Sequence, residues 1–257
     1  INRKKWAFLS VDEYFTFFKI AYDLRGNKFP KLKLLGGNII DFDIPFFSRS
    51  VFHLKSIYYD GIASQLYVDR RGSPEQKQYG FDTLNKIKAY AALAQASKKT
   101  ANKLFITEVN WPLIGMKNWA PAEDYLIDES QQSSYLVRYY LLMLATGKVK
   151  KCFWHQLVAP GYGLVNNLDE KIKKRDAYYC FQNLIAMLSG GTTKKMIREK
   201  NLFCLVIEKE EMLIEAIWSS EGSATFKSNP KQKIFDIRGK VIDTKKSPII
   251  NLSLIHI

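Results

Sequence analysis

The sequence predicts an α/β fold with a parallel sheet, followed by a small all-β region. In residues 1–191, short apolar runs alternate with longer segments that have helical spacing, which is typical of a parallel sheet. After Gly191 the apolar segments become short and β-rich, and Gly222, Asn229-Pro230 and Gly239 interrupt them. With 257 residues, of which 47% are hydrophobic, the chain can bury a core as one large domain or two smaller ones.

The helices are expected from capping signals and from the spacing of apolar residues. Ser10 and Glu13 form a capping box for the first helix, and Ser73 is expected to cap the third. Asp128 caps the fourth, and Gly147 stands where that helix should end. The expected helices span about 10–24, 46–55, 73–97, 128–146 and 176–188.

Four apolar runs are expected to form the parallel strands, and several shorter runs the all-β region. The parallel strands are expected at 32–42, 62–68, 104–107 and 149–154. The later β segments are expected at 202–208, 212–218, 224–227, 233–237 and 249–257. Residues 1–191 and 192–257 are therefore expected to form two domains.

The charge and the cysteines make several functions unexpected. A net charge of +14 attracts polyanions, but the lysines are scattered and no recognition motif accompanies them, so nucleic acid is not an expected partner. Cys152, Cys180 and Cys204 lack metal-site spacing, and neither a metal nor a cofactor is expected. No apolar stretch reaches the about 18 residues of a membrane span. No signal peptide is visible, but the chain begins at Ile1 without Met, so the compartment and the oligomeric state stay open.

Polar and aromatic residues follow the ends of the predicted parallel strands, where a parallel α/β barrel carries its active site. Glu108 is the sharpest candidate, because an apolar run from Leu104 to Thr107 ends in its carboxylate. In a partly dry pocket such a group can be a nucleophile, a general base or an orienting group. The alternative is a solvated residue at a strand end. The other strand-end residues are Asp41, Asp43, Tyr67, Asp69, Asn110, Trp111, Trp154, His155 and Gln156.

Six of these residues are candidates for binding a substrate: Tyr67, Asp69, Asn110, Trp111, Trp154 and His155. The two tryptophans could present flat apolar faces on which a sugar ring stacks. His155 could donate a hydrogen bond to a hydroxyl or be a satisfied polar residue. The Asp69-Arg70-Arg71-Gly72 loop could clamp a ligand or be an exposed ion-paired turn. No nucleophile elbow and no phosphate loop accompanies them.

Three segments resemble a retaining glycoside hydrolase with a TIM-barrel domain, in the broad group that contains families 5 and 39. Ile106-Thr-Glu-Val-Asn-Trp111 resembles the seventh-strand motif, whose Glu is the catalytic nucleophile. Val149 to Leu157 resembles the eighth strand, whose Trp floors the sugar site, and Arg175 to Leu184 resembles the start of the last helix. The resemblance implies a partial (β/α)8 TIM barrel, strands five to eight, followed by a small β-sandwich-like domain. It also implies that Glu108 is the nucleophile.

The resemblance implies a second carboxylate, the acid/base, at the end of strand four. A retaining mechanism needs two carboxyl groups about 5–5.5 Å apart. The segment from Ile1 to Trp6 resembles the one just after the acid/base, so that residue is expected upstream of Ile1. The 257-residue chain alone is then expected to be inactive, and the two open edges of a half barrel favour aggregation or pairing.

Three functions stay open at this point. The preferred one is a retaining glycoside hydrolase that acts on O-glycosyl bonds of a poly- or oligosaccharide, represented here by a fragment that lacks the acid/base. The second is a non-catalytic carbohydrate-binding or polysaccharide-assembly protein on the same barrel. The third is an unrelated α/β protein whose basic surface binds nucleic acid or another partner, which an affinity that collapses in salt would favour. The sequence names neither the sugar nor the linkage.

Overall fold

The computed structural model describes residues 10–98, 104–116, 125–168, 171–227, 232–243 and 249–252. The chain divides into two compact units. The sheet unit consists of Ile1–Asp69, Gln76–Val109 and Lys148–His155. The second unit consists of Arg70–Glu75, Asn110–Gly147 and Gln156–Ile257. Among the described helices, none combines the length and the hydropathy that a membrane span needs.

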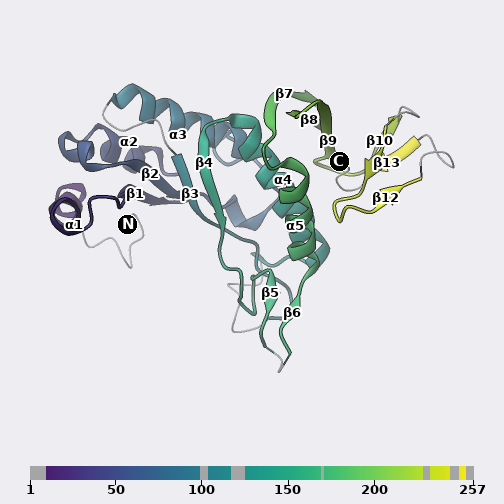
Figure 1. Ribbon diagram of the computed structural model, residues 1–257, viewed down its shortest axis with the longest axis horizontal. Helices are drawn as coiled ribbons and strands as arrows, with labels where there is room; N and C mark the ends of the chain where they lie inside the picture. Colours follow the sequence, from purple (N-terminus) through teal and green to yellow (C-terminus); the bar gives the residue numbers. More distant parts are fainter. Residues whose placement is uncertain are drawn as a thin grey trace. The chain divides into compact units, whose positions relative to one another are not determined.

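The sheet unit is built on a four-stranded parallel sheet whose strands lie side by side in chain order (Figure 1). Its strands are β1 (Leu35–Ile40), β2 (Gly61–Gln65), β3 (Leu104–Val109) and β4 (Val149–Trp154). The predicted parallel sheet is therefore confirmed. β4 has the predicted bounds, whereas β1 is shorter than predicted and β2 ends before Val68.

The helices of the sheet unit are α1 (Val11–Lys28), α2 (Ile44–Phe52), the 3-10 helix η1 (Leu54–Tyr58) and α3 (Thr83–Ser97). The capping box of Ser10 and Glu13 at α1 is confirmed, although the helix continues beyond Gly26 to Lys28. α2 packs on β1 and on α3.

Stacked aromatic rings form much of the core of the sheet unit. Phe15 of α1 stacks on Tyr59 at 5.3 Å between ring centroids, and Phe47 of α2 stacks on Tyr90 of α3 at 4.0 Å. Gly36 in β1 makes room for one of these rings, because a Cβ there would lie 1.8 Å from the Tyr59 ring. Such buried rings contribute large apolar areas to the core.

The predicted start of the third helix at Ser73 is wrong, since α3 begins ten residues later at Thr83. Tyr79 and Gly80 have φ angles of 53° and 83°, which a right-handed helix cannot contain. Asp82 provides the cap instead, and its side chain accepts from the backbone N–H of Asn85 at 2.9 Å.

Two helices of the second unit match their predictions closely and pack on each other: α4 (Glu129–Thr146) and α5 (Asp176–Leu188). Asp128 and Gln131 form a capping box at the start of α4. Gly147 ends α4 with a φ of 59°, the left-handed conformation that glycine adopts without steric cost. A short hairpin of β5 (Val165–Asn166) and β6 (Lys173–Lys174) precedes α5.

The later part of the second unit consists of β-strands, as predicted for the all-β region, and these strands pair antiparallel. β7, β8 and β9 form a three-stranded sheet, and β10 pairs with β13 and β11 with β12. The strands are β7 (Thr192–Glu199), β8 (Leu202–Lys209), β9 (Met212–Ser219), β10 (Ala224–Lys227), β11 (Ile234–Phe235), β12 (Val241–Ile242) and β13 (Ile249–Leu252). β7 and β12 were not predicted. The domain boundary at residue 191 stays a prediction, because the compact units are divided differently.

A buried ion pair joins three distant segments of the second unit. Arg138 of α4 donates to both carboxylate oxygens of Glu75, through Nε at 3.0 Å and through Nη2. Trp218 of β9 donates through Nε1 to the same carboxylate at 2.8 Å, and the carbonyl oxygen of Ser220 accepts from Arg138 at 3.3 Å. The side chains of Arg138 and Glu75 are only 7% and 5% exposed. The network therefore fixes the Arg70–Glu75 segment to α4 and to the antiparallel sheet.

Several predicted features lie outside the described residues. They are the segment from Ile1 to Trp6, Asn229-Pro230 and the end of the last predicted β segment, residues 253–257.

Candidate functional site

The carboxylate of Glu108 lies near the C-terminal end of β3, and two side chains hold it, one from the last residue of β2 and one from the turn after that strand. The phenol of Tyr67 donates to Oε2 at 2.6 Å, and the carboxamide Nε2 of Gln65 donates to Oε1 at 2.8 Å. Glu108 is partly exposed. An ionised carboxylate can accept about four hydrogen bonds, so these two fix its orientation and leave acceptor capacity for a ligand.

The backbone explains how Gln65 and Tyr67 reach the same carboxylate. Gln65 is the last residue of β2, and its carbonyl oxygen accepts from the N–H of Asp41 at 2.9 Å, next to β1. The same oxygen accepts from the N–H of Tyr67 at 3.1 Å, so the chain turns tightly directly after the strand. Parallel strands end at one edge of the sheet, and therefore the end of β2 lies beside the end of β3.

Gln65 is a site residue that the sequence analysis missed. It lies inside an apolar run and was counted as part of the strand. The available signal was its spacing of two residues from Tyr67 at a predicted strand end.

Trp154 and His155 follow at the end of β4, beside β3 in the sheet unit. Trp154 pairs in register with Val109, the residue after Glu108. The backbone N–H of His155 donates to the carbonyl oxygen of Val109 at 3.0 Å, which extends this pairing by one residue. Both side chains are partly exposed. The structure thus brings the backbones of both residues beside the end of β3.

Asp69 belongs to a polar cluster around a buried lysine at the start of α3. Lys86 is 1% exposed and donates through Nζ to Oε1 of Gln78 at 2.7 Å, and Gln78 contacts Asp69 at 3.5 Å. Burial lowers the pKa of Lys86 to about 8, against the opposing effect of the Asp69, Asp41 and Asp82 carboxylates. Sequence analysis did not single out Lys86, because a lysine in a helical pattern reads as a solvated residue.

Asn110 and Trp111 belong to the second unit. The carbonyl oxygen of Asn110 accepts from Arg71 at 3.4 Å, and Trp111 donates through Nε1 to the carbonyl oxygen of Gly72 at 2.9 Å. Trp111 is fully buried, and its ring meets Tyr139 of α4 edge-on. A stacking role for Trp111 stays a prediction, and its burial does not favour that role. Arg71 and Gly72 belong to the predicted clamp loop, and both are engaged within the protein.

The chemistry of the described side chains favours polar organic ligands. Among the residues that the structure describes, no group of three or more His, Cys, Asp or Glu side chains could hold a metal ion. The features found are an oriented carboxylate, a phenol, a carboxamide and a partly exposed tryptophan. An oriented carboxylate can attack an electrophilic carbon, and hydroxylated ligands can bond to the other groups.

Comparison with known proteins places the fold. No protein-family model matches the sequence, and no curated protein matches it. A solved family 39 glycoside hydrolase from the gut symbiont Bacteroides cellulosilyticus WH2 is similar in structure, with a TM-score of 0.76 and 16% identity. The similarity covers 95% of this chain and 54% of that one. The GH51 arabinofuranosidase from Xanthomonas axonopodis pv. citri is also similar, with a TM-score of 0.58, 12% identity, and coverage of 96% and 62%.

These comparisons define the class of fold. The chain has a glycoside-hydrolase-like α/β fold, which confirms the resemblance found in the sequence. It spans 54% and 62% of the lengths of the two solved proteins. At sequence identities of 16% and 12%, the structural similarity shows only the fold.

Proposed function

We propose that this chain is part of a retaining glycoside hydrolase that cleaves O-glycosyl bonds of a poly- or oligosaccharide, with Glu108 as the nucleophile. The observation that carries the proposal is the Glu108 carboxylate near the end of β3, held by the Tyr67 phenol and the Gln65 carboxamide. The glycoside-hydrolase-like fold supports it. The fold also favours this reading over the nucleic-acid-binding alternative.

In the proposed mechanism, Glu108 attacks the anomeric carbon as the bond to the leaving oxygen breaks. A second carboxyl group protonates that oxygen, and a glycosyl ester forms on Glu108. The second group then takes a proton from water, which attacks the anomeric carbon and releases the sugar and the free carboxylate. Tyr67 and Gln65 orient the attacking carboxylate, which lowers the entropic part of the activation barrier.

The proposed mechanism also needs the acid/base carboxylate. From the sequence resemblance, the acid/base belongs upstream of Ile1, so the 257-residue chain alone should be inactive. In the proposal, residues 1–191 are the second half of a (β/α)8 barrel, in which β1 to β4 are strands five to eight. Residues 192–257 form a small β domain. The parallel order of β1 to β4 and the antiparallel region after α5 support this assignment.

The substrate-binding part of the proposal retains the residues predicted from the sequence. Trp154 is the best placed stacking surface, because it is partly exposed and its backbone pairs beside the end of β3. His155 would donate to a sugar hydroxyl, and Tyr67 serves both the carboxylate and the ligand. Asp69 is a proposed hydroxyl partner, and Asn110 and Trp111 of the second unit stay binding candidates on the sequence alone.

The test is Glu108→Gln in the protein expressed from its complete reading frame. This change keeps the size of the side chain and an acceptor for Tyr67, but removes the attacking carboxylate. Loss of one acid–base group commonly costs about 10²–10⁴-fold, and loss of the nucleophile should reach the upper end of that range or exceed it. The rates on a panel of aryl glycosides measure this effect. Glu211→Gln, an exposed carboxylate in the turn after β8, is the matched control.

A fluorinated glycoside should trap the intermediate, and mass spectrometry should locate the adduct on the peptide that contains Glu108. Equal turnover by the wild type and Glu108→Gln would remove Glu108 from the mechanism. Binding of oligosaccharides without cleavage of any glycoside would favour the carbohydrate-binding or polysaccharide-assembly alternative.

A further inference from the structure

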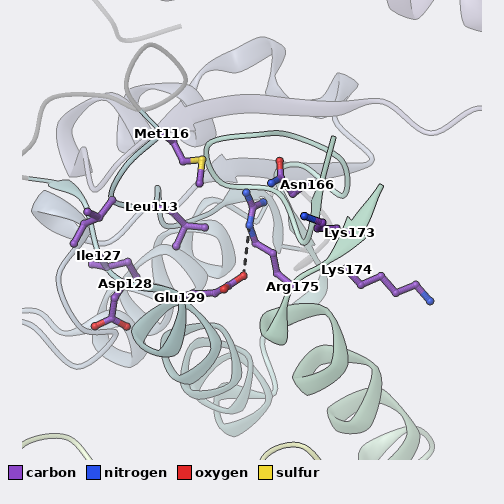
Figure 2. A pocket seen from close by; sticks show the side chains of 10 residues that line it. Leu113, Met116, Ile127, Asp128, Glu129, Asn166, Lys173, Lys174 and Arg175 are labelled. Atoms are coloured by element: carbon purple, nitrogen blue, oxygen red, sulfur yellow. Dashed lines mark ion pairs between the residues drawn. The ribbon is translucent and has the colours of Figure 1, made fainter. Parts of the chain in front are cut away.

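Three cationic side chains are buried in the part of the chain that the structure describes: Lys86, Arg138 and Arg175. The guanidinium of Arg138 is paired with the carboxylate of Glu75. Nε of Arg175 lies 3.6 Å from Oε1 of Glu129 (Figure 2). The guanidinium of Arg175 also donates to three carbonyl oxygens of one loop, those of Ala159 at 3.1 Å, Pro160 at 2.5 Å and Gly163 at 2.6 Å. Both arginines therefore meet a carboxylate, and their contacts fix segments of the second unit.

Lys86 of α3 differs from both arginines, because the acceptor of its ammonium is a neutral carboxamide. The side chain is 1% exposed, and Nζ donates to Oε1 of Gln78 at 2.7 Å. Nζ also lies 5.6 Å from the centroid of the Phe42 ring. A cation buried in this way destabilises the fold, and burial accordingly lowers the pKa of Lys86 to about 8. A buried lysine of this kind is a candidate for a role in function.

Lys86 acts on the chain segment that carries Tyr67. Nε2 of Gln78 lies 3.5 Å from Oδ1 of Asp69, so Gln78 links the ammonium to that carboxylate. The Asp69 carboxylate also attracts the ammonium directly, and its charge opposes the effect of burial on the pKa of Lys86 more than any other. Asp69 follows Tyr67 by two residues, and the Tyr67 phenol donates to Oε2 of Glu108 at 2.6 Å. Lys86 thereby fixes the position of one of the two groups that hold the Glu108 carboxylate.

The same face of α3 supports the other group, the carboxamide of Gln65. Tyr90 lies one turn after Lys86, and its phenol donates to the carbonyl oxygen of Asp41 at 2.9 Å. Asp41 has a φ of 57°, a conformation that is strained for a residue other than glycine and persists only where the surroundings fix it. The N–H of Asp41 donates to the carbonyl oxygen of Gln65 at 2.9 Å. Two neighbouring residues of α3 are therefore linked to the two side chains that hold Glu108.

We propose that Lys86 is a positioning residue, whose ammonium fixes the segment that carries Tyr67 and so keeps the Glu108 carboxylate in its attacking orientation. The inference rests on the proposed function and adds a requirement to it, namely that the amine is protonated. A neutral amine attracts the Asp69 carboxylate less strongly than an ammonium does. The hold on Tyr67 should therefore weaken when Lys86 loses its proton.

The ionisation of Lys86 gives the proposal a signature that a merely structural residue lacks. Among the described residues, the charged groups that act on its pKa are Asp69 after β2, Asp41 after β1 and Asp82 at the start of α3. The Tyr90 phenol stays neutral, because burial raises its pKa. Above about pH 8 the folded protein loses the ammonium, while the unfolded chain still binds the proton and the folded state gains stability. The rate of attack by the carboxylate and the stability of the fold should therefore change in opposite directions as the pH rises from about 8 to 10.

The experiment isolates attack by Glu108 with a 2,4-dinitrophenyl 2-deoxy-2-fluoroglycoside of the sugar that the wild type cleaves fastest. This reagent traps the glycosyl ester, and its leaving group needs no proton from the acid/base. In the protein expressed from its complete reading frame, Lys86→Met should lower the rate constant of trapping about tenfold or more, because small misplacements of a reacting group can cost about 10²-fold. The dissociation constant of the reagent should stay within about twofold, because Lys86 acts on orientation and not on binding.

Three further variants separate positioning from folding. Lys86→Arg keeps a charge that does not titrate, so it should restore part of the rate and remove the decline above about pH 8 that the wild type shows. Gln78→Ala leaves the lysine in place and should also slow trapping. Lys88→Met removes an exposed lysine of the same helix and should react like the wild type. At pH 7 Lys86→Met should be at least as stable as the wild type in urea unfolding, because it removes a buried cation, although it reacts more slowly.

Hydrogen exchange, read by mass spectrometry, tests the link to Tyr67 without a substrate. The amides of residues 65–69 should exchange faster in Lys86→Met than in the wild type at the same pH. The inference is overturned by equal exchange in these two proteins, by wild-type trapping rates in both Lys86→Met and Gln78→Ala, or by a wild-type rate that does not decline above about pH 8.

The failure of this inference and the failure of the proposed function give different results. If the wild type cleaves a glycoside and Glu108→Gln does not, but Lys86→Met is trapped like the wild type, this inference alone fails. If Glu108→Gln cleaves as fast as the wild type, or the wild type cleaves no aryl glycoside, the proposed function fails and this inference fails with it.

Discussion

The buried pair of Glu75 and Arg138 allows a stability prediction with a definite size. Arg138→Leu removes the cation and leaves the Glu75 carboxylate buried, with Trp218 as its remaining hydrogen-bond donor in this network. Breaking a buried pair by removing one partner costs about 3–5 kcal/mol, because an uncompensated charge stays behind. For a chain of this size, each kcal/mol lowers the melting temperature by about 2–4 °C, so a drop of roughly 10 °C is expected.

The double variant Glu75→Leu/Arg138→Leu separates two free energies: the cost of an unpaired buried carboxylate and the net contribution of the ion pair to stability. Replacing both partners by apolar residues is commonly near neutral, so the double variant should recover most of the loss. Thermal and urea unfolding, followed by circular dichroism, is measured for the wild type, Glu75→Leu, Arg138→Leu and the double variant, which together form a double-mutant cycle. Arg238→Leu serves as a control, because Arg238 pairs with Asp176 at the surface and such pairs contribute about 0–1 kcal/mol. An Arg138→Leu protein that unfolds like Arg238→Leu would refute the reasoning.

Two further predictions concern the sheet unit. Tyr67→Phe should lower aryl glycoside turnover about 10–100-fold, because a hydrogen bond to a charged group is worth about 1.5–3 kcal/mol; turnover equal to wild type would mean that the phenol does not position Glu108. Lys86 has a pKa of about 8 in the folded protein against 10.5 as its ordinary value, so between these pH values the unfolded chain binds the extra proton and stability rises with pH. The free energy of unfolding of the wild type, measured in urea, should rise by on the order of 2 kcal/mol between pH 7.5 and 10, and Lys86→Met should lack this rise. The same dependence of the unfolding free energy on pH in both proteins would contradict this prediction.

Local signals were sufficient for the elements whose ends are set by nearby residues. Asp128 and Gly147 bound α4 through a capping side chain and a left-handed backbone conformation, both of which can be read from the sequence. β4 was also found at its true limits, from Val149 to Trp154. The position of Glu108 at a strand end followed from the same kind of pattern.

Features that depend on distant partners could not be predicted in this way. β7 is mostly exposed and carries four charged residues, so it lacks an apolar alternation and forms because it pairs with β8. Ser73 and the proline after it look like a helix start, yet the turn at Tyr79 and Gly80 postpones α3. The burial of Trp111 and the role of Gln65 likewise depend on contacts far away in the chain.

The guanidinium of Arg175 also restricts how this protein can vary. The guanidinium fixes the length of the 159–163 loop, because it donates to three carbonyl oxygens of that loop at once. Gly163 closes that loop so tightly that a Cβ there would lie 2.3 Å from the backbone nitrogen of Ala159. Insertions or deletions between Ala159 and Gly163 would separate oxygens that one rigid guanidinium must reach. Related proteins should therefore keep the length of the loop that Arg175 spans.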